Sequence, residues 1–179
     1  MRNIEIKARI DSVAAITPRV ASLATDGPVQ ISQDDTFFHC VTGRLKLRAF
    51  SNDLGELIFY RRVNQAGPKE SFYLRSPTSS PETLRESLSL AYGQIGRIRK
   101  YRTLYLVGRT RVHLDRVEGL GHFLELEVML VDDESPEQGI REAGELMDKL
   151  GIQPGQLIEG AYLDLMVGTA GAAPTEPAA

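Results

Sequence analysis

The sequence predicts a mainly β protein of the α+β class: a closed or nearly closed eight-stranded antiparallel β-barrel with peripheral helices. Several short stretches carry charged residues at every second position with apolar residues between them, so each strand has one charged and one apolar face. Short loops join most of these strands, which favours antiparallel pairing. A barrel turns the charged faces toward a wet lumen and the apolar faces toward covering helices. About eight strands leave room inside for a small ligand.

The bulk composition indicates one soluble globular domain. The chain has 179 residues, of which 42% are hydrophobic and 25% are charged. We expect a single domain over residues 1–167 and a disordered tail at 168–179, where Ala, Gly and Pro dominate. The net charge of -3 argues against a nucleic-acid partner. The lone Cys40 allows no internal disulfide and fits a reducing compartment. Because apolar runs are too short to span a bilayer, we expect a cytoplasmic protein without a membrane partner. The sequence does not decide between a monomer and a homodimer.

The first half of the chain is predicted to pass from a strand to a helix and back to strands. Residues 2–10 form the first strand, and Asp11 caps a helix that Pro18 interrupts or restarts, with Thr17 as the new N-cap. Asp26-Gly27-Pro28 ends that helix. The following strands are predicted at 29–32, 36–41, 44–50, 56–63 and 71–76.

Two serine–proline pairs predict helix starts in the second half. Ser80-Pro81 and Ser135-Pro136 each place serine at the N-cap and proline at the first helical position. Gly93 and Gly151 end these helices, and Gln138 completes a capping box with Ser135. Strands are predicted at 95–107, 109–117 and 122–132, and a short helical or extended piece at 155–166.

Cationic side chains gather on the charged faces of the predicted strands. The alternation groups Arg44 with Lys46 and Arg48, Lys100 with Arg102, and Arg109 with Arg111, while Lys7 and Arg62 lie on further strands. Like charges packed together repel unless a polyanion neutralises them. Arginine forks bind phosphate oxygens in pairs, and lysine adds a movable point charge. Cross-strand salt bridges explain any single pair, but cations outnumber carboxylates on the proposed face, which favours a bound polyanion.

Carboxylates on the same faces suggest a metal site. Glu125 and Glu127 are two residues apart in an apolar strand, so they project the same way. Together with Glu5 they form a hard-oxygen set suited to Mg²⁺ or Mn²⁺, to which Asn3 and Asp115 add ligands or outer support. The alternative interpretation pairs these acids with the arginines opposite them.

One histidine shares a face with the charged residues. His113 lies between Arg111 and Asp115. It either donates to a phosphate while Asp115 orients its ring, or it is a structural histidine. The sequence has no Gly-x-x-x-x-Gly-Lys loop, so a P-loop nucleotide site is not supported.

Taken together, these stretches resemble the CYTH group of triphosphate tunnel metalloenzymes, and within it the class IV adenylyl cyclase-like branch. The matching stretches, in the family's order, are 4–7, 43–48, Tyr60 with Arg62, 67–69, 99–102, 111–115 and 119–127. The resemblance extends from residue 3 to about 165. It implies an antiparallel tunnel that holds a linear triphosphate and a divalent metal.

The resemblance also implies roles for individual residues. Metal binding is implied for Glu5, Glu125 and Glu127, while Asn3 stands where the family signature Glu-x-Glu-x-Lys has its first glutamate. Asparagine offers a neutral oxygen, so a second metal ion is expected to bind more weakly. Triphosphate binding is implied for Lys7, Lys46, Arg48, Arg62, Lys100, Arg102 and Arg111, to which the residue pattern adds Arg44 and His113. Lys100 and Asp115 are the expected catalytic residues.

Three functions stay open on the sequence. The resemblance favours an adenylate cyclase, in which the ribose 3′-hydroxyl of ATP attacks the α-phosphorus, giving cyclic AMP and pyrophosphate. The alternative is a triphosphatase that hydrolyses inorganic triphosphate or thiamine triphosphate with a metal-positioned water. A third function is a non-catalytic sensor that binds a triphosphate or nucleotide, which Asn3 would favour.

Overall fold

Eight strands and four α-helices make up the part of the chain that the computed structural model describes, residues 2–62 and 65–170, with side chains described up to Met166. The strands are β1 (Arg2–Arg9), β2 (Asp26–Phe38), β3 (Arg44–Ala49), β4 (Gly55–Arg62), β5 (Lys69–Thr78), β6 (Gln94–Val107), β7 (Thr110–Val117) and β8 (Gly121–Leu130). The helices are α1 (Val13–Leu23), α2 (Pro81–Tyr92), α3 (Pro136–Leu150) and α4 (Tyr162–Ala170), with a short 3-10 helix η1 at Pro154–Gln156. None of the described helices is long and apolar enough to cross a membrane.

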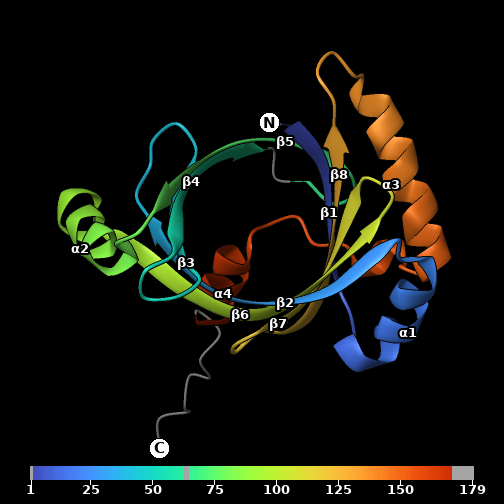
Figure 1. The fold of residues 1–179 in the computed structure, drawn as a ribbon, viewed down its shortest axis with the longest axis horizontal. Coiled ribbons are helices and arrows are strands. Elements are labelled where there is room, and N and C mark those ends of the chain that lie inside the picture. Colours follow the sequence, from blue (N-terminus) through green and yellow to red (C-terminus); the bar gives the residue numbers. More distant parts are fainter. Residues whose placement is uncertain (1, 63–64, 171–179) are drawn as a thin grey trace, which may run out of the picture.

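The strands form one antiparallel sheet that closes into a barrel, in the order β1-β5-β4-β3-β2-β6-β7-β8 (Figure 1). The closing pair is β1 with β5, where Arg2 lies opposite Phe72 and Glu5 lies opposite Lys69. Closure removes the unpaired strand edges that an open sheet would expose. The predicted antiparallel barrel with peripheral helices is therefore confirmed.

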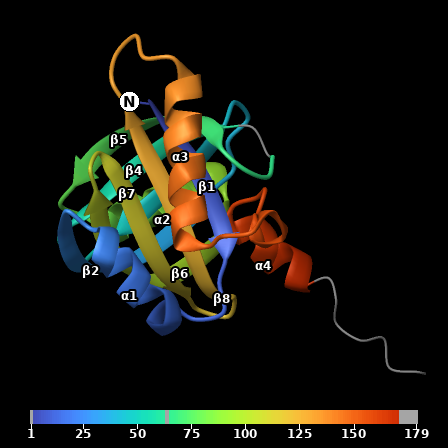
Figure 2. The same cartoon turned by 90° about the vertical axis from the view of Figure 1, so that its right-hand side faces the viewer.

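Helices α1 and α3 cover the outside of the barrel over β1, β7 and β8 (Figure 2). Most outward side chains of these strands are apolar: Ile4 and Leu126 are fully buried beneath the helices. Val20 of α1 and Leu150 of α3 belong to the same apolar cluster. Burial of these apolar faces outside the barrel leaves the alternate, charged side chains facing inward.

Helix α4 covers one end of the barrel (Figures 1 and 2). Its residues Tyr162 and Leu163 pack with Phe37 of β2, Ile98 of β6 and Phe123 of β8 in a second apolar cluster. The predicted short piece around Tyr162 is thus helical. Because these partners come from the inward faces of the strands, the C-terminal segment fills that end of the barrel.

The prediction of separate strands at 29–32 and 36–41 is wrong, because one continuous strand, β2, runs through the first range and ends within the second, at Phe38. The polar residues Gln33–Asp35 between them do not form a loop; they pair with β6 on one side and partly with β3 on the other. Asp26-Gly27-Pro28, predicted as a helix end, lies at the start of the same strand. Burial of Asp35 within a strand is tolerated because two cations of β3 bind its carboxylate.

Helix α1 passes through Pro18 without a break, so the prediction that it restarts at Thr17 is wrong. Its N-cap is Ser12 and not Asp11. Val20, which follows the proline, is fully buried against the barrel. Tertiary packing on this face outweighs the loss of one helical hydrogen bond.

Two predictions near the C-terminus also differ from the structure. The capping box of Ser135 with Gln138 is wrong, because the Ser135 hydroxyl donates to the carboxylate of Glu137 instead. Helix α4 extends to Ala170, past the predicted domain boundary at 167. The remainder of the predicted tail, 171–179, lies outside the described residues.

Candidate active site

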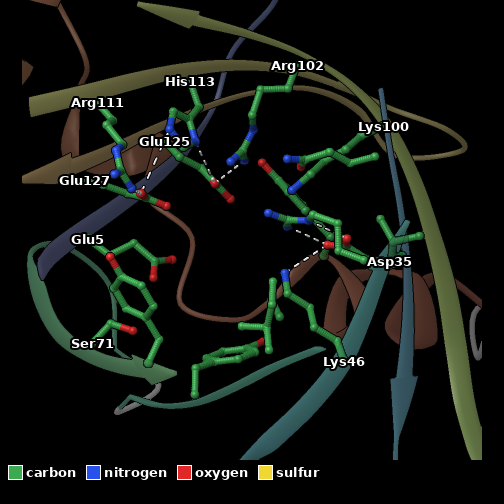
Figure 3. A pocket seen from close by; sticks show the side chains of 18 of the residues that line it. Glu5, Asp35, Lys46, Ser71, Lys100, Arg102, Arg111, His113, Glu125 and Glu127 are labelled. Atoms are coloured by element: carbon green, nitrogen blue, oxygen red, sulfur yellow. Dashed lines mark hydrogen bonds and ion pairs between the residues drawn. The ribbon is translucent and has the colours of Figure 1, made fainter. Parts of the chain in front are cut away.

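The inward-facing side chains enclose a cavity of about 370 Å³ inside the barrel (Figure 3). Of the described residues that line it, eight are Lys or Arg and five are Asp or Glu, so the cavity has a surplus of cations. Figure 3 shows the labelled side chains pointing from different strands toward one central space. A confined cationic cavity of this kind concentrates the electrostatic field and attracts polyanions.

Strand register brings the charged residues of β1, β8 and β7 together. Lys7 on β1 lies opposite Glu125 on β8, and Glu125 lies opposite His113 on β7. Two residues along, Glu5 lies opposite Glu127. Because directly opposite residues share a face of the sheet, these side chains form one continuous wall.

Arg102 lies at the centre of a buried ion-pair network. Its Nε and Nη2 donate to the two oxygens of Asp115 at 2.7 and 2.6 Å, and Nη2 also donates to Glu125 at 2.5 Å. The hydroxyl of Tyr162 donates to Asp115 at 2.9 Å, and the Lys7 ammonium lies 2.9 Å from Glu125. Burial alone would raise the pKa of Glu125, but Lys7 and Arg102 outweigh it and hold that pKa well below its usual range.

Lys100 adds an amine whose protonated and neutral forms are both populated near neutral pH. Its ammonium lies 3.7 Å from Asp115 and 5.0 Å from the centre of the Tyr162 ring. Burial and the neighbouring Arg102 lower the pKa of Lys100 to about 7. An anion bound beside Lys100 would favour its protonated form, so a bound polyanion would itself strengthen this contact.

A second ion-pair group lies on β2 and β3. Arg48 donates to both oxygens of Asp35 at 2.7 and 2.8 Å, and Lys46 donates to one of them at 2.9 Å. Burial would raise the pKa of Asp35, but Arg48 and Lys46 hold it well below its usual range. The carboxylate therefore keeps both cations in place at the cavity wall.

A cluster of oxygen and nitrogen donors on the opposite wall fits a divalent metal ion. His113, Glu125 and Glu127 each offer one ligand atom, and these atoms lie within 4.8 Å of one another. Both ring nitrogens of His113 are buried without a hydrogen-bond partner in the described part of the chain, as is Oδ1 of Asn3. Carboxylate oxygens suit Mg²⁺ and Mn²⁺, and the imidazole of His113 adds one nitrogen ligand to this oxygen-rich set. An ion bound here would be coordinated by one of the two His113 nitrogens, which face Glu125 at 3.8 Å and Glu127 at 4.0 Å.

A family model decides the classification. The CYTH domain model matches residues 1–162. The chain belongs to the CYTH family. It is 25% identical over 169 residues to the adenylate cyclase CyaB of Aeromonas hydrophila, a match that covers 90% of this chain and 87% of CyaB.

Solved structures share the tunnel fold of this CYTH domain. The PH1012 protein of Pyrococcus horikoshii OT3 superposes with a TM-score of 0.81 at 23% identity, covering 91% of this chain and 98% of the other. HpAC1 from Hippeastrum, an adenylyl cyclase-like protein described as having a dominant triphosphatase activity, superposes with a TM-score of 0.65 at 18% identity, covering 96% of this chain and 97% of the other.

Most of the predicted site residues of this CYTH domain line the one cavity. They are Asn3, Glu5, Lys7, Lys46, Arg48, Arg62, Lys100, Arg102, Arg111, His113, Glu125 and Glu127. Asp115 is fully buried behind Arg102 and is not among the described residues that line the cavity. Arg44 pairs with Asp164 of α4 at 2.8 Å and lines a separate hollow. The expectation that Arg109 shares the face of Arg111 is wrong, because Arg109 precedes β7 and pairs with Glu134 and Glu142.

Asp35, Tyr162 and Lys69 are among the residues that the structure adds to the site of the CYTH domain. Asp35 and Tyr162 line the cavity, and Lys69 lies opposite Glu5 with its side chain buried. Asp35 is two residues from Phe37, so an unbroken strand over this stretch would have predicted both side chains on one face. Lys69 falls within a stretch that resembles the family. The position of Tyr162 depends on the docking of α4, for which the sequence carries no local signal.

Proposed function

We propose that this CYTH domain is a divalent-metal-dependent enzyme that binds ATP by its triphosphate in the barrel and converts it to cyclic AMP and pyrophosphate. The observation that carries the proposal is the cavity itself, in which converging cations face a carboxylate–histidine cluster. The similarity to a protein named adenylate cyclase supports the choice of reaction.

In this proposal the cations hold the phosphates and stabilise the leaving group. Lys46, Arg48 and Arg102 contact phosphate oxygens, and their positions are fixed beforehand by Asp35 and Asp115. The 3′-hydroxyl oxygen forms a bond to the α-phosphorus and loses its proton to water, while the bond from the α-phosphorus to the oxygen that bridges it to the β-phosphorus breaks. Preorganised cations stabilise the charge that develops on pyrophosphate without reorganising during the reaction.

The carboxylate–histidine cluster would hold the metal ion. Its ligands would be Glu127, His113 and Glu125, with Glu5 beside Glu127. A bound divalent ion supplies Lewis-acid chemistry, lowering the proton affinity of the nucleophile and offsetting phosphate charge. Glu125 is already bound by Lys7 and Arg102, so Glu127 is the more available carboxylate.

Hydrolysis of a triphosphate is the second candidate function. The same cavity would hold inorganic triphosphate, and the fold is shared with HpAC1, which is described as a triphosphatase. In that reaction a water oxygen forms a bond to a terminal phosphorus while the bond from that phosphorus to its bridging oxygen breaks, so that orthophosphate forms and pyrophosphate leaves. The two candidates differ in which phosphorus is attacked.

Product analysis separates the candidate functions. The protein is incubated with ATP or inorganic triphosphate and Mg²⁺ or Mn²⁺, and the products are separated by anion exchange. We expect cyclic AMP and pyrophosphate from ATP, and loss of both in the matched variant R48A, which excludes a contaminating enzyme. Orthophosphate release without cyclic AMP would identify a triphosphatase. Binding without turnover would identify a sensor.

Substituting Asn3 tests its place at the metal cluster. The Asn3 side chain lines the cavity with an oxygen that has no hydrogen-bond partner among the described residues, and Asn3 is two residues from Glu5 on the same strand face. We expect N3E to tighten Mn²⁺ binding roughly ten-fold, because it adds a charged ligand. Calorimetric titration measures this, with N52E as a control that adds the same charge on an exposed loop. Unchanged or weaker Mn²⁺ binding in N3E would remove Asn3 from the metal site.

A further inference from the structure

Three of the apolar side chains that line the charged cavity lie on, or directly after, three neighbouring strands. They are Ile31 on β2, Leu104 on β6 and Phe50, which follows β3 directly; together we call them the apolar wall. Ile31 lies opposite Arg102, and Leu104 is two residues further along β6 on the same face. The proposed function assigns no role to this wall.

The apolar wall lies at the end of the cavity away from α4. Along β6 the inward residues run from Ile98, which packs with α4, through Lys100 and Arg102 to Leu104. Along β2, starting from the end near α4, the inward residues run from Phe37, which packs with α4, to Ile31. Each strand therefore passes from a filled apolar end through a charged middle to a second apolar end.

The apolar wall differs from the filled end in its exposure. Ile98 is 1% exposed beneath the C-terminal helix. The three wall residues are only partly buried, although each borders the cavity. Partly exposed apolar groups inside a cavity lined mainly by charges are costly unless a ligand covers them.

The wall adjoins the proposed metal cluster. Leu104 on β6 lies directly opposite His113 on β7. It also lies about 7 Å beyond Arg102 along the strand, from the rise of two residues. If a ligand group packs against the apolar wall and its nearest phosphate lies at Arg102, only a short linking group fits between them. That linking group lies beside the proposed metal cluster.

We infer that the apolar wall is the nucleobase subsite, with the base against Phe50, Ile31 and Leu104 and the terminal phosphate directed toward α4. The inference rests on the proposed function, since it requires the triphosphate to lie in the charged middle. Base faces stack on aromatic rings and pack on aliphatic side chains without requiring one particular base. Polar edges of the nucleoside would face Arg75 and Glu56, which line the cavity 3.7 Å apart.

This orientation selects among the candidate reactions. With the base on the wall, the ribose and the α-phosphorus lie beside His113, opposite Leu104. The β- and γ-phosphates then extend toward Lys7 and Lys100 near Tyr162. A nucleoside triphosphate gains contacts that inorganic triphosphate lacks, so the preferred substrate class is a nucleotide.

Binding of two matched ligands tests the subsite. The ligands are the bis-methylene analogues of ATP and of inorganic triphosphate, which cannot be turned over, titrated calorimetrically with Mn²⁺ present. We expect F50A and L104A each to weaken binding of the ATP analogue roughly ten-fold. Binding of the inorganic analogue should stay within about two-fold, which also shows that the variants are folded. Y101A is the control, because Tyr101 is 58% exposed on the outward face of β6.

The remaining outcomes would contradict the inference in distinguishable ways. Unchanged binding of the ATP analogue to both variants would place the base elsewhere. If both variants bind the two analogues equally more weakly than the wild type does, the wall contributes to phosphate binding or to folding. That result would also overturn the base subsite. If the wild type binds the inorganic analogue alone, the nucleotide substrate is wrong while the tunnel proposal stands. If it binds neither, the proposed function fails.

Discussion

Replacing Arg102 with alanine is expected to lower the free energy of unfolding by about 3–5 kcal/mol and to remove triphosphate binding. The guanidinium is 4% exposed and donates three hydrogen bonds, two to Asp115 and one to Glu125. Its removal leaves two buried carboxylates with fewer positive neighbours, and burial disfavours their charged forms. Urea unfolding at neutral pH measures the loss.

The pH dependence of R102A provides a sharper test. In the wild type Arg102 and Lys100 overcome burial and lower the pKa of Asp115, so the pairing stabilises the fold at neutral pH and is lost as the pH falls. In R102A burial would raise the pKa of that carboxyl above its unfolded value. Stability of the variant would then increase as the pH falls, and its deficit should be smaller near about pH 4.5 than at neutral pH.

R99A is the matched control for this substitution. Arg99 lies on the outward face of β6, with its side chain 54% exposed and 3.4 Å from Asp34. An exposed pair of this kind contributes about 0–1 kcal/mol. If R102A and R99A lose the same small amount of stability, the network around Arg102 does not hold the barrel together.

Side-chain direction within a strand is a local property, and for this reason most lumen-facing residues were predictable. The period of two places Lys46 and Arg48 on one face wherever β3 happens to lie. It also separates Arg61 from Arg62, and the structure places only Arg62 in the cavity wall. The presence of a barrel followed from the number of such strands and their short connections.

Features that depend on distant partners were not predictable in the same way. Asp35 lies within a polar run that suggests a loop, and only the cations of β3 make its burial acceptable. Tyr162 reaches Asp115 because α4 folds back over the end of the barrel. The buried carboxylates also neutralise more of the positive charge in the barrel than counting charges on each predicted strand face indicates. Each of them binds two or more cations, as is the case for Asp35, Asp115 and Glu125.

Replacing Arg62 with alanine is expected to lower kcat/KM for the triphosphate substrate roughly 100-fold or more, while R61A stays within about two-fold. Arg62 lines the cavity, donates from Nη1 to Glu5 at 2.5 Å and keeps a buried Nε without a hydrogen-bond partner among the described residues. That unused donor and its charge are available to a phosphate. Arg61, the next residue in β4, is exposed and lies over the rings of Phe59 and Phe72 outside the cavity.

The two ligands of the site should respond to R62A in opposite directions. Loss of a cation beside Glu5 weakens triphosphate binding, but it frees that carboxylate and removes a charge that repels a metal ion. Mn²⁺ should therefore bind the ligand-free variant at least as tightly as it binds the wild type, as titration calorimetry measures. A joint loss of Mn²⁺ and triphosphate binding would show that Arg62 supports the structure of the whole wall. Equal kinetics in R62A and R61A would take Arg62 out of the phosphate site.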